Sequence, residues 1–213
     1  KVGVLLPPSV AGAAVNYAAS LLGKAPINLN YTASNELITA SAQQANIRTV
    51  VTSRAFLEKL PNLKPPGSVI ILEDLALNPR TSEKLAALAL TWLFPVRLLE
   101  RVLGRANPAS VDELITVIFS SGSTGEPKGV MLTHYNVGAN CRQIAQLFML
   151  DGRDKVLGIL PFFHAFGYTV PPWLPAVLGV GAVYYPNPLD AKAIGELVEQ
   201  HRITFMVATP TFL

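Results

Sequence analysis

The sequence predicts an α/β fold built from one or more largely parallel sheets flanked by helices. Short runs of β-branched and apolar residues alternate with longer segments of helical periodicity, which is the pattern of repeated strand and helix units. A Ser, Thr or Asp stands directly before several of the helical segments, where its side chain can cap the first turn. With 213 residues and 50% hydrophobic content, the chain can bury a sizeable core as one large domain or two small lobes.

The first third of the chain predicts four strands and two helices. A strand at 2–6 comes first, and the helix after it is capped by Ser9 and ended by Gly23. Ser34 caps a second helix that runs to about residue 46. Further strands are expected at 26–29, 49–52 and 69–72. This alternation is typical of a parallel sheet.

The segment 81–104 has a helical pattern that Pro95 interrupts, so we expect two helices or one kinked helix. After the proline, Arg97, Arg101 and Arg105 follow one another at intervals of four and form a cationic stripe. Opposite this stripe lie the apolar residues Leu98, Leu99, Val102 and Leu103. Such a helix could rest on a membrane surface or on a partner. We favour the commoner alternative, a solvated helix face that covers a core.

The second half predicts a strand at 114–120 that is apolar throughout, as buried strands are, and a second strand at 129–132. A glycine-rich loop therefore joins two strands. Beyond it, Thr133 and Asp190 each cap a helix, the first running to about residue 150. The remaining elements are strands at 155–160, 182–185 and 204–208, an aromatic loop, and a Pro-rich helix at 172–178.

Composition and charge exclude several classes of function. The 17 basic and 14 acidic residues are dispersed, so the net charge of +3 gives no support to nucleic-acid binding and suits a small anionic ligand. The single cysteine, Cys141, lies in a predicted helix and has no partner for a disulfide or a metal site, so we expect a buried thiol and a reducing compartment. The start at Lys1 carries no signal peptide, and both ends look cut, so we expect a piece of a longer protein.

The loop from Ser120 to Gly129 holds three glycines, four hydroxyl side chains and one lysine directly after a buried strand. Glycines let backbone N–H groups approach an anion, hydroxyls donate hydrogen bonds, and a lysine supplies a compact positive charge, so this composition suits phosphate. It is not a Walker A loop, because Pro127 stands where the second glycine is required, and it is not a dinucleotide fingerprint, because it opens a strand and not a helix. A plain Gly/Ser hairpin is the alternative without function.

Ser120-Ser121-Gly122-Ser123-Thr124-Gly125-Glu126-Pro127-Lys128-Gly129 resembles at every position the signature loop of the adenylate-forming, or AMP-binding, superfamily. This superfamily includes acyl-CoA synthetases, luciferases and the adenylation domains of peptide synthetases. Pro161-Phe162-Phe163-His164-Ala165-Phe166-Gly167 resembles its aromatic-histidine segment, although a histidine among aromatic residues is usually a core residue. Residues 23–30 resemble a further segment, which we interpret as structural. Within the superfamily, the chain is most similar to the acyl-ACP synthetase domain of bacterial two-function proteins that also carry a lysophospholipid acyltransferase.

The resemblance implies a fatty-acid ligase that uses ATP with Mg²⁺ to form an acyl-adenylate and then transfers the acyl group to the thiol of acyl carrier protein or coenzyme A. Lys128 and His164 would take part in the reaction, His164 by orienting the carboxylate. The nucleotide would be bound by Ser120, Ser121, Gly122, Ser123, Thr124, Gly125 and Lys128. Magnesium is implied because ATP brings it, although no metal-binding carboxylate is identifiable in the sequence.

On this interpretation, residues 1–213 are a fragment of the N-terminal AMP-binding domain, without its start, its C-terminal part and the small C-terminal domain, and the isolated chain should be inactive. The full-length protein is expected in the cytoplasm, with the inner face of the cytoplasmic membrane as a second place of contact. Two alternatives stay open: another adenylate-forming enzyme, such as an amino-acid adenylation domain, or an inactive nucleotide- or lipid-binding module.

Overall fold

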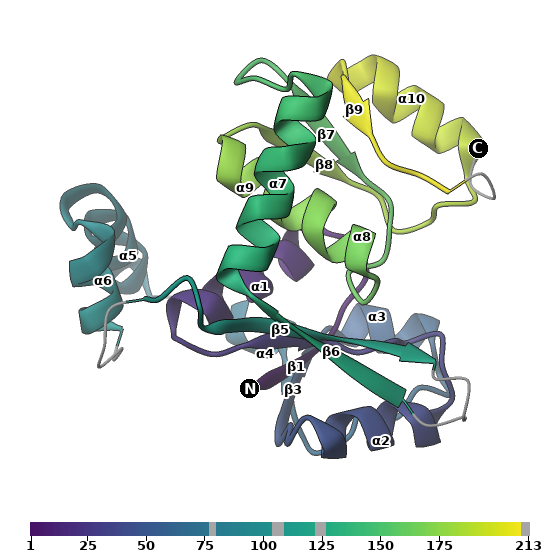
Figure 1. Ribbon diagram of the computed structural model, residues 1–213. Helices are drawn as coiled ribbons and strands as arrows, with labels where there is room; N and C mark the ends of the chain where they lie inside the picture. The colour runs from purple at the N-terminus through teal and green to yellow at the C-terminus, as the bar shows by residue number, and fades with distance from the viewer. Residues whose placement is uncertain (77–79, 104–108, 122–126, 210–213) are drawn as a thin grey trace.

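Four strands near the N-terminus form a parallel sheet (Figure 1). The computed structural model describes residues 1–76, 80–103, 109–121 and 127–209. The strands are β1 (Val2–Leu5), β2 (Pro26–Asn28), β3 (Thr49–Thr52) and β4 (Ser68–Ile71), and their order in the sheet is β2-β1-β3-β4. Because β1 lies between β2 and β3, the chain adds β2 on one side of β1 and then crosses to the other side.

The first two helices begin at their predicted caps. For α1 (Val10–Leu21), the Ser9 Oγ accepts from the Gly12 N–H at 3.0 Å. For α2 (Asn35–Gln44), Ser34 has the same role. Two short helices of six and five residues, α3 (Arg54–Lys59) and α4 (Leu72–Ala76), were not predicted, since neither is long enough to show a period of 3.6 residues.

A buried pair of asparagines joins α1 to β2. The Asn28 Nδ2 donates to the Asn16 Oδ1 at 2.8 Å, and the Asn16 Nδ2 donates to the Gly12 carbonyl at 2.8 Å. Both side chains are almost completely buried, so these bonds satisfy amide groups that would otherwise be costly to bury. A structural role for residues 23–30 is thus supported at Asn28.

The strands on either side of the glycine-rich loop, β5 (Leu114–Ser121) and β6 (Pro127–Thr133), form an antiparallel hairpin. Strand β5 lies between two cores. Val117 packs with residues of the first sheet and α2, whereas Ile115 and Ile118 pack with α7 (His134–Phe148) and the elements after it. The Thr116 Oγ1 also donates to the Pro26 carbonyl at 2.7 Å, which ties β5 to β2.

A second parallel sheet has the order β8-β7-β9 and consists of β7 (Lys155–Gly158), β8 (Gly181–Tyr184) and β9 (Phe205–Met206). The prediction of largely parallel sheets flanked by helices is confirmed. Helices α7 (His134–Phe148) and α10 (Ala191–His201) begin at the predicted caps Thr133 and Asp190. Cys141 is completely buried in α7, as expected.

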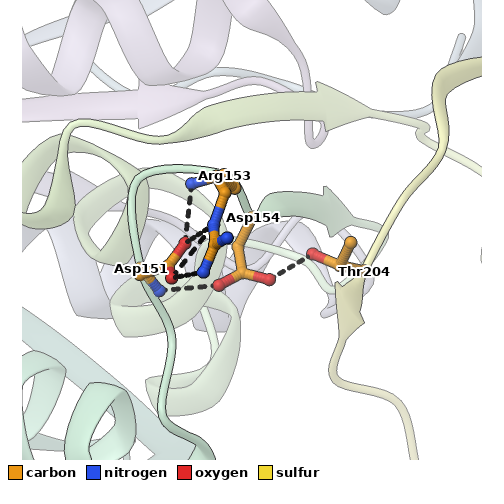
Figure 2. Close-up of polar contacts among 4 residues, drawn as sticks. All are labelled: Asp151, Arg153, Asp154 and Thr204. Carbon is orange, nitrogen blue, oxygen red and sulfur yellow. Dashed lines mark hydrogen bonds and ion pairs between the residues drawn. The ribbon is translucent and has the colours of Figure 1, made fainter.

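Polar side chains join the starts of β7 and β9 (Figure 2). The Thr204 Oγ1 donates to the Asp154 Oδ1 at 2.7 Å and accepts from the Lys155 N–H at 3.0 Å. The other oxygen of Asp154 accepts from the Asp151 N–H at 2.7 Å, and the Arg153 guanidinium holds the Asp151 carboxylate at 2.6 Å. This cluster fixes the turn that leads into the central strand of the second sheet.

The expected aromatic loop is wrong in its second half, since the chain is helical from α8 (Ala165–Tyr168) through α9 (Leu174–Leu178). Thr169–Trp173 between them forms a π-helical turn, labelled η1. Prolines 171 and 172 lack the N–H that a regular α-helix would use, and a wider turn accommodates that loss. The irregular part of the aromatic segment is therefore confined to the residues before Ala165.

Helices α5 (Thr81–Leu93) and α6 (Val96–Val102) meet at Pro95, as predicted, but they do not cover a core. None of the side chains of α5 is buried, and α6 buries only Glu100. Figure 1 shows this pair standing apart from the two sheets. The favoured interpretation of α6 as a solvated face over a core is wrong, because Leu98 and Val102, opposite the cationic stripe, are 41% and 55% exposed. In the described ranges, no helix is both long and apolar enough to cross a membrane.

Candidate functional site

The glycine-rich loop begins and ends at the turn end of the β5–β6 hairpin, where the structure pairs two of the predicted site residues. Ser120 on β5 is paired with Lys128 on β6, and the Ser120 Oγ lies 3.5 Å from the Lys128 carbonyl oxygen. Both side chains are exposed. The hairpin therefore offers a hydroxyl and an ammonium group side by side at the entrance of the loop.

A close contact fixes Gly129 next to this pair. A Cβ on Gly129 would lie 2.8 Å from the Val117 Cγ1 and 3.1 Å from the Phe119 Cε1, so only glycine fits without movement of the core. The other predicted residues of the loop, Gly122, Ser123, Thr124 and Gly125, lie outside the described residues. Ser121 is described only by its backbone, which pairs with Pro127.

His164 stands at the N-cap of α8, at the end of the irregular aromatic segment. Its ring lies 4.5 Å from the ring of Phe163, which in turn contacts Tyr31 at 4.8 Å, at the end of β2. Partial burial lowers the pKa of His164, so its imidazole is mainly uncharged at neutral pH. A neutral imidazole can donate one hydrogen bond to a carboxylate and accept another.

Most of the aromatic side chains near His164 are core residues. Phe162, Phe163 and Tyr168 are at most 3% exposed, whereas Phe166 is 63% exposed. The Tyr168 Oη donates to the Ile115 carbonyl at 3.4 Å, which attaches α8 to β5. These aromatic residues therefore hold the segment in place, and Phe166 alone among the four is free to meet a ligand.

A cavity of about 620 Å³ opens at the carboxyl ends of the first sheet, where the strand order reverses between β1 and β3. Ligands of open α/β sheets bind at such a reversal. Its lining is mainly apolar, and Lys59 contributes a cation. Other residues of its lining include Leu6, Pro7, Tyr31, Ser53, Ala55 and Phe56.

A carboxylate that the sequence analysis missed holds one wall of this cavity. Glu73 accepts from the Ser53 Oγ at 2.7 Å and from the N–H groups of Arg54 and Ala55, so it caps α3. These bonds lower the pKa of Glu73 to about 2. Tyr31, Ser53 and Phe56 were missed as well, because the alternation of strands and helices along the sequence does not show where the strand order reverses.

Among the described residues, no three His, Cys, Asp or Glu side chains gather as they would around a metal ion. Of the groups that ATP would bring, the described part of the hairpin fits the anionic phosphates, since it presents Lys128 and the Ser120 hydroxyl. We assign no protein ligand to a metal.

Comparison with known proteins identifies the family. The model of the AMP-binding enzyme family matches residues 1–213. A feruloyl-CoA synthase of Amycolatopsis sp is 30% identical over 85% of the chain and 37% of its own length. A long-chain-fatty-acid–CoA ligase of Bacillus subtilis is 36% identical over 46% of the chain and 18% of its own length. The chain thus spans well under half the length of these curated relatives.

The fold is also shared with solved structures. The o-succinylbenzoate coenzyme A synthetase of Bacillus subtilis, solved in complex with AMP, superimposes with a TM-score of 0.77 at 19% identity, over 99% of this chain and 49% of the other. The chain belongs to the AMP-binding enzyme family.

Proposed function

We propose that the chain is part of the AMP-binding domain of an ATP-dependent fatty-acid ligase. The observation that carries this proposal is the hairpin, which places Ser120 and Lys128 side by side where the glycine-rich loop begins and ends. The similarity to a long-chain-fatty-acid–CoA ligase supports a fatty acid as the substrate. The similarity to a feruloyl-CoA synthase favours an aromatic acid as a second candidate.

In the first step, a carboxylate oxygen of the acid attacks the α-phosphorus of ATP. The bond to the bridging oxygen breaks, and pyrophosphate leaves with the electron pair. Lys128, Ser120 and, by their place in the sequence, Ser121, Ser123 and Thr124 would hold the β- and γ-phosphates and stabilise the charge that develops there. Magnesium would enter with ATP and neutralise part of that charge. His164 would orient the carboxylate as a neutral hydrogen-bond partner.

In the second step, the thiolate of an acceptor attacks the carbonyl carbon and AMP leaves. We propose coenzyme A or acyl carrier protein as the acceptor and assign it to the cavity between β1 and β3. Both acceptors present their thiol at the end of a phosphorylated arm, and an apolar cavity with Lys59 in its wall suits such an arm. We propose the reducing cytoplasm as the compartment, in line with the free buried Cys141.

The proposal is tested with Lys128→Ala in the full-length protein, with Lys192→Ala as the matched control. Lys192 is also exposed, and its nearest acidic partner is 3.9 Å away. Loss of one charged hydrogen bond to phosphate should weaken ATP binding by about 10- to 100-fold. Acid-dependent exchange of pyrophosphate into ATP should fall with it. Unchanged ATP affinity in Lys128→Ala would contradict the phosphate assignment.

The acid is identified by comparing fatty acids, ferulate and amino acids in the same exchange reaction. Exchange with amino acids alone would make the protein an amino-acid adenylation enzyme, and no exchange with any acid would make it a binding module. The acceptor site is tested by Ala55→Trp, which fills the cavity and should raise the KM for the acceptor while pyrophosphate exchange stays unchanged. The isolated chain of 213 residues should be inactive.

A further inference from the structure

The α5–α6 pair exposes a large apolar surface that no other part of the described chain covers. On α5, Leu85, Leu88 and Trp92 are spaced three and four residues apart, which places them on one face of the helix. Their exposed fractions are 61%, 57% and 85%. Contiguous apolar surface of this kind on a folded protein marks an interaction site.

The junction of the two helices continues this surface. Leu93 and Val96 flank Pro95 and are 74% and 63% exposed. Val102, one turn and a half further on, is 55% exposed. The apolar surface therefore runs along α5 and around the junction into α6.

Positive charge borders the same surface. The exposed cations of the described segment are Arg80 and Lys84 at the start of α5 and Arg97 and Arg101 on α6. Of the two carboxylates in these helices, Glu100 is buried and Glu83 is bonded to the Arg80 N–H at 3.0 Å. The solvent-facing charge is therefore predominantly positive.

We propose that α5 and α6 dock this protein on the surface of a bilayer that contains anionic phospholipids. An apolar face with tryptophan and leucine, bordered by Lys and Arg, is the pattern of helices that lie in the interface of a membrane. Tryptophan prefers this depth because its ring is apolar and its N–H is polar. With 13 residues, α5 is too short to span the hydrocarbon core, which needs about 20.

A second copy of the chain is a poorer occupant. Two copies that met through this surface would bring the same cations face to face, and like charges across an interface are repulsive. Anionic headgroups instead complement Arg97 and Arg101 while the acyl region receives Leu88 and Trp92. This docking is independent of the proposed ligase activity.

Co-sedimentation of the 213-residue chain with vesicles tests the proposal. We expect binding at least tenfold tighter to phosphatidylcholine vesicles that contain phosphatidylglycerol than to phosphatidylcholine alone, and loss of that difference at high salt. The fluorescence emission of Trp92 should shift to the blue on binding. Because the chain has a second tryptophan, Trp173, the source of the shift must be checked. The shift should be absent in Trp92→Phe.

Two variants with matched controls locate the contact. Leu88→Ser should weaken binding at least threefold, whereas Leu147→Ser, at a side chain 75% exposed on α7, should not. The double variant Arg97→Gln, Arg101→Gln should remove most of the preference for anionic vesicles. The double variant Arg142→Gln, Lys192→Gln removes as much charge elsewhere and should keep it.

The proposal would be overturned by no binding to either vesicle, by equal binding to both, or by α5 and α6 variants that bind as well as their controls. Self-association of the lipid-free chain that Leu88→Ser abolishes would also overturn it, in favour of a second copy as the occupant.

Discussion

Gly167 closes the aromatic-histidine segment, and its replacement by alanine should distort that segment. A Cβ at this position would lie 1.9 Å from the Pro161 carbonyl oxygen and 2.7 Å from its carbon. These are backbone atoms, so no side chain can rotate away. Because real Cβ contacts are essentially never below 3.0 Å, the carbonyl or α8 must move by at least 1.1 Å.

The cost follows from that displacement. Overpacking against backbone should destabilise the fold by about 3 kcal/mol, and alanine should recover about 1 kcal/mol through its helix propensity. The net loss of about 2 kcal/mol should lower Tm by about 4 to 8 °C for a chain of this size. The moved carbonyl also accepts the His164 N–H at 3.2 Å, so His164 should shift with it. In the full-length enzyme, we expect a loss of adenylation of up to about 100-fold.

Thermal unfolding followed by circular dichroism measures the first effect. Gly138→Ala in α7 is the control, because a Cβ there meets nothing within 4 Å. That variant should gain the helix propensity without the clash and melt slightly above the wild type. If Gly167→Ala melts at or above the wild-type temperature, the close contact with Pro161 does not exist in solution.

Three further predictions concern stability and reactivity. The pKa of Glu73 in the folded protein is about 2, below its ordinary 4.5, so the stability that its carboxylate contributes is complete above pH 4.5 and is lost as pH falls towards 2. In urea titrations, the difference in unfolding free energy between the wild type and Glu73→Gln should therefore disappear between these pH values. A difference that stays constant over this range would contradict the prediction. Thr204→Val should lower the free energy of unfolding by about 1 kcal/mol and Tm by about 2 to 4 °C. The reason is that Asp154 loses a hydrogen-bond donor and the Lys155 N–H loses its acceptor. An unchanged Tm would refute this prediction. Burial raises the pKa of Cys141 to about 11, so the thiol should resist alkylation until the chain unfolds, and rapid labelling of the native protein would disprove it.

The sequence predicted those parts of the fold that local chemistry determines. Ser9, Ser34, Thr133 and Asp190 each accept a backbone N–H at the helix start that they predicted, because a cap depends on its own turn and little else. The π-helical turn at 169–173 escaped prediction, since it depends on how two prolines are accommodated inside a packed helix.

Long-range contacts explain the other differences. The pattern of α6 correctly predicted a helix but could not show which elements lie beside it, so the expected core beneath it was wrong. In the site, the sequence predicted a strand on each side of the glycine-rich loop, and the pairing of Ser120 with Lys128 followed from strand register. Glu73 was missed because it caps a helix that begins 19 residues earlier, a contact without any local signal.

The position of β5 between two cores has a consequence for how the molecule unfolds. Strand β5 supplies Val117 to the hydrophobic core of the first sheet and Ile118 to the core of the second. If β5 leaves either core, the other core therefore loses packing as well. The described chain should therefore melt as one cooperative unit and not lobe by lobe, with coincident transitions for probes placed in either sheet. A destabilising change at the start of β9 would then also lower the population of molecules in which the β5–β6 hairpin is folded.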